Sequence, residues 1–181
     1  WEVNDTDELA STLAALGAVQ TQFNDNARGK RAVSMADMIV LAGAAAIESA
    51  AAERGHDLTI GFTPGRMDAS QAQTNVNSFA ALEPVADGFR NYYDEDRNYM
   101  SPVGAMIDKA NLLDLTPPEM TALVGGLRVL GANTAGSSHG VLTDREGQLS
   151  NDFFVNLLDM NVEWTASTEF PGVYIARDRK T

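Results

Sequence analysis

Histidines are the first side chains to consider, because they ligate metals and transfer protons near neutral pH. The chain has two of them, His56 and His139, separated by more than eighty residues. Neither is accompanied by a second histidine or by a carboxylate at a metal-ligand spacing such as His-Glu-x-x-His. The chain also contains no cysteine, which excludes thiolate chemistry and cysteine metal sites. The sequence therefore predicts no metal centre and no catalytic acid or base.

Two short motifs match catalytic or ion-binding patterns only in part. Segment 136–140, Gly-Ser-Ser-His-Gly, fits the hydrolase pattern Gly-x-Ser-x-Gly, which needs a strand before the serine, a helix after it and a histidine further on. A helix is expected before this segment, and no histidine lies beyond His139. Segment 94–98 has the first acidic positions of a calcium loop, but Tyr99 and Ala105 stand where glycine and glutamate are required. We interpret both matches as accidental.

The elements that would position any site are predicted to be mostly helices. Three capping pairs mark helix starts: Asp5 with Glu8, Ser34 with Asp37, and Thr116 with Glu119. The predicted helices cover 6–23, 35–54, 102–113, 119–130 and, after a Ser150 cap, 151–160. The 35–54 stretch is apolar on nearly every side up to Ala46, which predicts a helix buried all round. Residues 162–177, around Pro171 and Gly172, favour a small β-hairpin. The predicted fold class is mainly α.

Length and charge limit the classes of function. A chain of 181 residues predicts one domain or a large part of one. Its formal net charge of −12 repels phosphate backbones and anionic lipids, so we expect neither nucleic acid nor membrane as a partner. The longest apolar run, 38–47, is about half of a membrane span. No leader segment is visible, which favours a cytoplasmic location. The long connection 58–77 is expected to be functional or pinned by its neighbours.

Five segments carry a family resemblance, and they occur in the family's order. They are 34–43 (SMADMIVLAG), 62–68 (FTPGRMD), 82–91 (LEPVADGFRN), 118–133 (PEMTALVGGLRVLGAN) and 149–160 (LSNDFFVNLLDM). Together they resemble the C-terminal half of a bifunctional catalase-peroxidase. The likeness runs, with gaps, over residues 1–181, which would then be part of a C-terminal peroxidase-like domain lacking both flanks. It implies a haem-peroxidase-like helical fold without haem.

The resemblance implies a role as well as a fold. Catalase-peroxidases hold haem b in an N-terminal domain, which decomposes hydrogen peroxide and oxidises organic donors, whereas their C-terminal domain holds none. This chain is therefore expected to be non-catalytic, with no cofactor of its own. It would support the active-site architecture of the haem domain and contribute subunit contacts in a homodimer. Its expected partners are the haem domain of the same chain and a second copy of the parent.

Three positions depart from the haem domain's pattern. The resemblance places Arg128 where the iron-binding histidine would be, Leu149 where a tryptophan would be, and Ala44 where an asparagine would be. A haem ligand must offer a lone pair, and the guanidinium of arginine has none available. Arg128 thus cannot ligate iron. A buried arginine also needs a partner, and we expect a carboxylate.

Two other functions remain open from the sequence. One is a small haem peroxidase, for which His56 and His139 are the remaining candidate iron ligands. The other is a helical small-ligand-binding module that uses a vestigial haem cavity near Gly125 and Gly126. These two glycines lie inside a predicted helix, where each costs about 1 kcal/mol relative to alanine. That cost indicates close packing against another element or a bound group.

Overall fold

In the computed structural model, the main helices begin at capping residues. The structure describes residues 1–27, 31–87, 92–94, 96–169 and 172–180. Its helices are α1 (Thr6–Asn26), α2 (Met35–Ala52), α3 (Val76–Ala80), α4 (Pro102–Leu112), α5 (Pro117–Val129) and α6 (Asp152–Leu157), with 3₁₀ turns η1 (Glu2–Asn4), η2 (Gln71–Gln73) and η3 (Thr134–Gly136). The strands are β1 (Ala86–Asp87), β2 (Tyr92–Tyr93), β3 (Val162–Ala166) and β4 (Tyr174–Asp178). The mainly α prediction is confirmed.

The helix starts agree with the predicted caps. Asp5 accepts a hydrogen bond from the backbone N–H of Glu8 at 3.3 Å, and Ser34 Oγ accepts one from Asp37 at 3.0 Å. At α5 the backbone N–H and hydroxyl of Thr116 both donate to Glu119 Oε2, at 2.8 and 2.6 Å. These bonds satisfy donors that the first turn of a helix leaves unpaired.

Two antiparallel hairpins accompany the helices. β3 pairs with β4 from Val162 opposite Asp178 to Ala166 opposite Tyr174, which confirms the predicted hairpin. The smaller pair, β1 with β2, was not predicted. It lies between the predicted helices 35–54 and 102–113, where the sequence predicted no strand. Helix α6 is also shorter than predicted: its N-cap is Asn151, and Ser150 Oγ accepts the Asp152 N–H at 3.3 Å.

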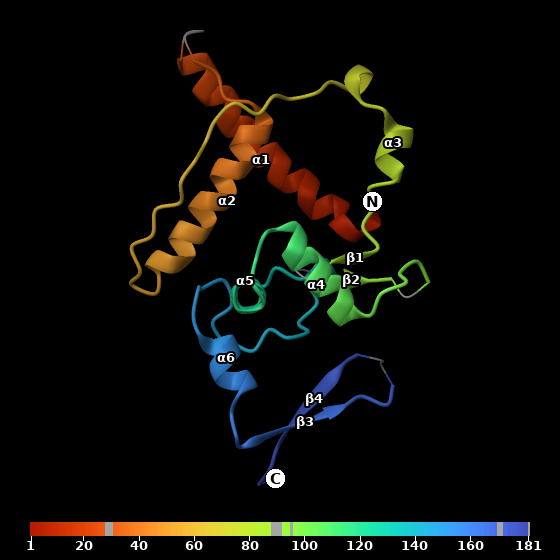
Figure 1. Cartoon of the computed structure of the whole chain (residues 1–181). Coiled ribbons are helices and arrows are strands. Elements are labelled where there is room, and N and C mark those ends of the chain that lie inside the picture. The colour runs from red at the N-terminus through yellow and green to blue at the C-terminus, as the bar shows by residue number, and fades with distance from the viewer. Residues whose placement is uncertain (28–30, 88–91, 95, 170–171, 181) are drawn as a thin grey trace.

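The elements are spread along the molecule (Figure 1). Helices α1 and α2 lie together at one end, α4, α5 and α6 form the middle, and β3–β4 lies at the opposite end near the C-terminus. Six apolar side chains are buried among the described residues: Met38, Ala50, Ala51, Ala110, Met120 and Val129. The chain exposes 13031 Å². A compact monomer of its 19.4 kDa mass would expose about 8,500 Å².

The prediction that the 35–54 helix is buried all round is wrong for this chain. In α2, Ile39 is 47% exposed, and Val40, Leu41 and Ile47 are 36 to 39% exposed. The apolar composition indicated a buried helix, but the described elements leave these four side chains partly exposed. Of the described helices, α2 is also the one long and apolar enough to cross a membrane. That finding rests on length and composition alone, which a core helix of a water-soluble protein satisfies equally.

Candidate functional site: the surroundings of Arg128

Arg128 lies in the last turn of α5 and is only 4% exposed. Its aliphatic stem runs against the backbone of Gly140, where an added Cβ would lie 3.3 Å from Arg128 Cδ. The guanidinium Nη1 donates a hydrogen bond to Asn133 Oδ1 at 2.8 Å. The arginine is therefore enclosed between its own helix and the loop that follows.

Asn133 holds that loop around the guanidinium. Its side-chain Nδ2 donates to the carbonyl of Ser137 at 2.6 Å and to that of His139 at 3.1 Å, while its Oδ1 accepts from Arg128. All the hydrogen-bonding groups of this amide except one lone pair are thereby engaged. The chain turns into the loop at Gly131, whose φ of 70° is in the left-handed region that favours glycine after a helix. Asn133 is thus the residue that links Arg128 to the path of the loop.

The carboxylate of Asp87, at the end of β1, interacts electrostatically with the positive charge of Arg128. Burial lowers the pKa of Arg128 from its ordinary value, and the negative charge of Asp87 raises it. An arginine remains protonated at neutral pH despite such a shift. Arg128 is therefore a buried cation, with a neutral amide as hydrogen-bond acceptor and a carboxylate as electrostatic partner.

Aromatic rings fill the space beside the glycine pair of α5. A Cβ added to Gly125 would lie 2.5 Å from Phe154 Cζ and 2.9 Å from Phe153 Cδ1. The two rings pack edge to face, with centroids 5.1 Å apart. At Gly126 the nearest atom to an added Cβ is Leu149 Cδ1 at 3.6 Å, an ordinary contact. The cost of Gly125 within a helix thus has a physical reason, since no side chain fits between α5 and α6.

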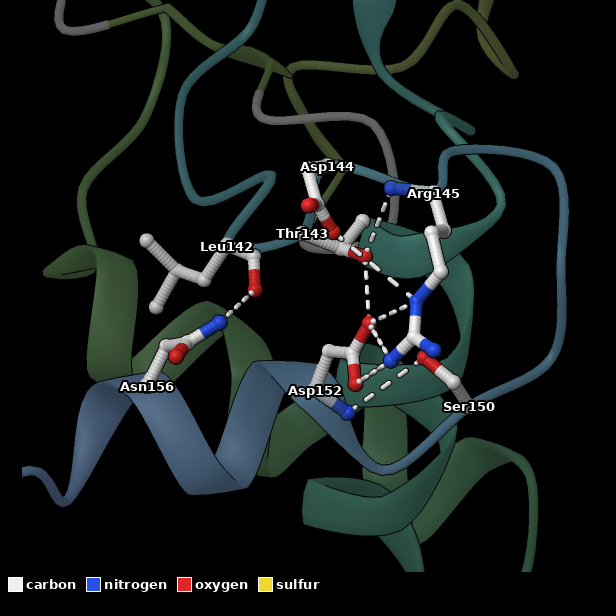
Figure 2. A network of polar contacts seen from close by, with 7 residues as sticks. All are labelled: Leu142, Thr143, Asp144, Arg145, Ser150, Asp152 and Asn156. Atoms are coloured by element: carbon white, nitrogen blue, oxygen red, sulfur yellow. Dashed lines mark hydrogen bonds and ion pairs between the residues drawn. The ribbon is translucent and has the colours of Figure 1, made fainter.

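A polar network holds the loop before α6 in place (Figure 2). Arg145 donates from Nη2 to both carboxylate oxygens of Asp152, at 2.6 and 2.8 Å, and Thr143 Oγ1 donates to Asp152 Oδ2 at 2.6 Å. Hydrogen bonds from Arg145 and Thr143 lower the pKa of Asp152 to about 2. One turn further on, Asn156 Nδ2 donates to the carbonyl of Leu142 at 2.7 Å. These contacts fix α6, and with it the two phenylalanines, against α5.

The residues around Arg128 do not fit a haem group. The guanidinium offers no lone pair to iron, and a cation facing ferric iron is repelled. Beside Gly125 there is no room even for a methyl group, because the rings of Phe153 and Phe154 already occupy that space. The part of a vestigial cavity that was expected next to Gly125 is therefore filled by the protein itself.

The predicted site residues are brought together only in part. Leu149 packs against Gly126, two residues before Arg128, and its backbone N–H donates to the carbonyl of Ala50 at 3.2 Å. Leu149 therefore joins α5 to the end of α2. Ala44 lies on α2 and is half-buried, away from that junction by one and a half turns. Sequence reasoning missed Asn133 and Asp87, although both lie in or beside segments that carry the family resemblance.

The histidines and the two short motifs lie in places that are not typical of a catalytic site. His56 is exposed and lines an open cleft of about 580 Å³ together with Leu149 and Asp152. Within the described part of the chain, no three histidine or acidic side chains are grouped as metal ligands. Ser138 follows the 3₁₀ turn η3 instead of a strand, so segment 136–140 lacks the geometry of a hydrolase nucleophile. Of the calcium-like segment 94–98, Glu95 lies outside the described residues.

Comparisons with known proteins identify the family. The peroxidase family, described as "Peroxidase", matches residues 1–171, and the chain belongs to it. The chain is 58% identical over all its 181 residues to "Catalase-peroxidase 2" of Shewanella sp. (strain MR-7) and to "Catalase-peroxidase" of Yersinia pestis (strain Pestoides F). It spans 24% and 25% of these two proteins, about a quarter of their length. The family resemblance drawn from the motifs is confirmed.

Proposed function

We propose that this chain is part of the haem-free, C-terminal peroxidase-like domain of a catalase-peroxidase. In this proposal the parent protein is a cytoplasmic oxidoreductase that decomposes hydrogen peroxide and oxidises organic donors with haem b in its N-terminal domain. The present chain carries out none of these steps itself. It supports the active-site architecture of the haem domain and contributes subunit contacts in a homodimer, with no nucleic acid or membrane as partner.

The observation that supports this most directly is the packing around Arg128. The resemblance assigns this position to the iron-binding histidine, and the residue found there is a buried cation held by Asn133. The rings of Phe153 and Phe154 lie against Gly125 on the same helix. A peroxidase-family helix with these features is suited to packing and unsuited to holding iron.

A role in contacts is supported by the exposed area of the chain. It exposes 13031 Å², about 4,500 Å² more than a compact monomer of its mass. The exposed side chains include large apolar ones, such as Phe79 at 52%, Leu82 at 67% and Val103 at 69% exposed. Surfaces of this size and composition are typical of polypeptide that packs against other polypeptide.

The test uses the full-length protein and a version truncated to its haem-containing half. We expect the truncated protein to lose most of its catalase activity and to show an altered Soret band. Adding back the missing half as a separate chain should restore both at least in part. If the truncated protein keeps the activity and haem spectrum of the full-length protein, the supporting role is wrong.

Haem stoichiometry tests the non-catalytic part of the proposal separately. The full-length protein should bind one haem per chain, and so should the variant Arg128→His, because the rings beside Gly125 still leave no room for haem. A pyridine haemochrome assay with a protein concentration measurement gives this ratio. Two haems per wild-type chain would contradict the proposal. Two haems only in Arg128→His would show that the arginine alone, and not the ring packing, excludes the cofactor.

A further inference from the structure

Met67 differs from most methionines of the chain because its side chain lies almost entirely in water. The chain has seven methionines, and the exposed fraction of Met67 is 86%, whereas those of Met38 and Met120 are 9% and 3%. A thioether that fills no part of the core contributes little through packing. What remains available at such a position is the reactivity of the sulfur, which follows its exposure.

The backbone on both sides of Met67 is anchored to α2, beside which the segment runs back (Figure 1). Arg66 donates from its backbone N–H and from Nη1 to Asp37 Oδ1, at 3.3 and 3.0 Å. On the other side, the carboxylate of Asp68 accepts hydrogen bonds from the backbone N–H groups of the first two residues of α2, at 2.8 and 2.9 Å. Because both neighbours are held at the start of α2, the Met67 side chain is kept on a defined part of the surface.

The turn before Met67 adds a third anchor. The backbone N–H of Gly65 donates to Asp37 Oδ2 at 2.9 Å, and the φ of Gly65, 123°, is a conformation that favours glycine. Asp37 itself is only 6% exposed, so these bonds are shielded from water. All the anchoring bonds are made by backbone groups and by the side chains of the neighbours. A chemical change at the sulfur of Met67 therefore leaves them intact.

We propose that Met67 is a modification site at which hydrogen peroxide oxidises the protein reversibly to methionine sulfoxide. A lone pair of Sδ attacks one peroxide oxygen, so that an S–O bond forms while the O–O bond breaks. The other oxygen leaves as water after it takes up the proton of the attacked oxygen. The sulfur loses two electrons and the peroxide gains them, so thioether and hydrogen peroxide give sulfoxide and water. The inference goes beyond the proposed function and shares with it only the oxidant.

Burial separates Met67 from the methionines of the core. Met120, in α5, is reached by peroxide only when the surrounding packing opens, because 3% of it is exposed. A sulfoxide formed there would also place a polar oxygen among apolar side chains, which costs free energy unless the oxygen finds a hydrogen-bond donor. At Met67 the same oxygen is hydrated. Oxidation of Met67 is therefore fast and compatible with the fold.

Met160 is exposed to a similar degree, at 83%, and lies in the turn between α6 and β3. Hydrogen bonds beside it join close neighbours, as between the backbone N–H of Asn161 and Asp159 Oδ1 at 2.9 Å. Met67 differs because the residues on both sides of it bond to a separate helix, more than 25 residues away in the sequence. The proposal is therefore made for Met67, whose surroundings are fixed by contacts between two parts of the chain.

Peptide mapping of the full-length protein tests the proposal. Trypsin, which cuts after lysine and arginine, releases Met67 in segment 67–90 and Met120 in segment 110–128, and each segment contains a single methionine. The protein is treated with hydrogen peroxide after its haem has been blocked with cyanide, so that the peroxide is not consumed. The rate at which each peptide gains one oxygen is divided by the rate in urea-unfolded protein. We expect this ratio to be at least about tenfold higher for Met67 than for Met120.

Met67→Leu is the matched control, because leucine keeps an apolar side chain and removes the sulfur. Segment 67–90 of this variant should gain no oxygen, and a methionine sulfoxide reductase should remove the oxygen gained by the wild type. A difference smaller than tenfold between the two methionines overturns the proposal, as does faster proteolysis of segment 58–68 after oxidation. None of these measurements depends on whether the chain supports the haem domain, so failure of the proposed function and failure of this inference are told apart.

Discussion

Adding one methyl group at Gly125 should destabilise the helix pair α5–α6, although the same change at the next residue should stabilise it. Alanine is favoured over glycine by about 1 kcal/mol within a helix. At Gly125 the new Cβ would lie 2.5 Å from Phe154 Cζ and 2.9 Å from Phe153 Cδ1, so one of the rings must shift. Overpacking of this kind typically costs 1–3 kcal/mol. We therefore expect Gly125→Ala to lower local stability by up to about 2 kcal/mol.

Gly126→Ala is the matched control, because it has the same helix and the same change in side chain. The nearest atom to its new Cβ is Leu149 Cδ1 at 3.6 Å, an ordinary contact that requires no shift. The helix preference then acts alone and should raise local stability by about 1 kcal/mol. The two variants are predicted to differ in sign, which makes the comparison independent of the absolute scale.

Hydrogen exchange of the α5 amides in the full-length protein measures this difference locally, because protection reports the free energy of opening. Each 1.4 kcal/mol corresponds to about a tenfold change in protection. Protection should fall for Gly125→Ala, by up to about 27-fold, and rise about fivefold for Gly126→Ala. If both variants gained protection, the close approach of the phenylalanine rings to α5 would be wrong.

Three further changes address the polar contacts. Arg128→Ala should lower local stability by about 3 kcal/mol, because it removes the cation beside Asp87 and leaves Asn133 without its donor. Hydrogen exchange of the α5 amides measures this loss, and an unchanged exchange rate would contradict the prediction. The pKa of Asp152 is lowered to about 2 from an ordinary value of 3.8, so its stabilising contribution is complete above about pH 4 and is lost as the pH falls toward 2. Asp152→Asn should therefore flatten the dependence of stability on pH between about pH 4 and pH 2. An unaltered slope over this range would refute the prediction. Asp68→Ala removes the bonds to the start of α2 and should speed proteolysis of segment 58–68, whereas unchanged cleavage would show that the other contacts hold it.

The helix starts could be predicted from the sequence because their determinants are local. A cap and its partner are three residues apart, as in Thr116 and Glu119, and form their hydrogen bonds whatever the rest of the chain does. The β3–β4 hairpin was predicted for the same reason, since its strands are close in sequence. The β1–β2 pair has only two residues in each strand, too few to leave a pattern of alternation.

From the sequence it could be predicted that Arg128 has partners, but not which residues they are. Burying an arginine requires partners, but sequence cannot say which groups the loop will bring to it. Asn133 supplies the hydrogen bond and Asp87 the charge, and Asp87 reaches the site through a hairpin that the sequence did not indicate. The same holds for Arg145 and Asp152, seven residues apart in a loop and a short helix, where no periodic spacing forecasts an ion pair.

The exposed side of α2 and the filled space at Gly125 lead to one physical conclusion about this chain. At Gly125 the chain supplies its own filling, because Phe153 and Phe154 occupy the space beside α5. On α2 the chain supplies the bracing, through Asp37 and Asp68, but not the apolar cover. Sequence composition cannot distinguish these cases, since both helices are apolar and both contain glycine. Only the position of neighbouring side chains shows that Phe153 and Phe154 cover Gly125 of α5, whereas no atom lies within 4 Å of a Cβ added at Gly43 of α2.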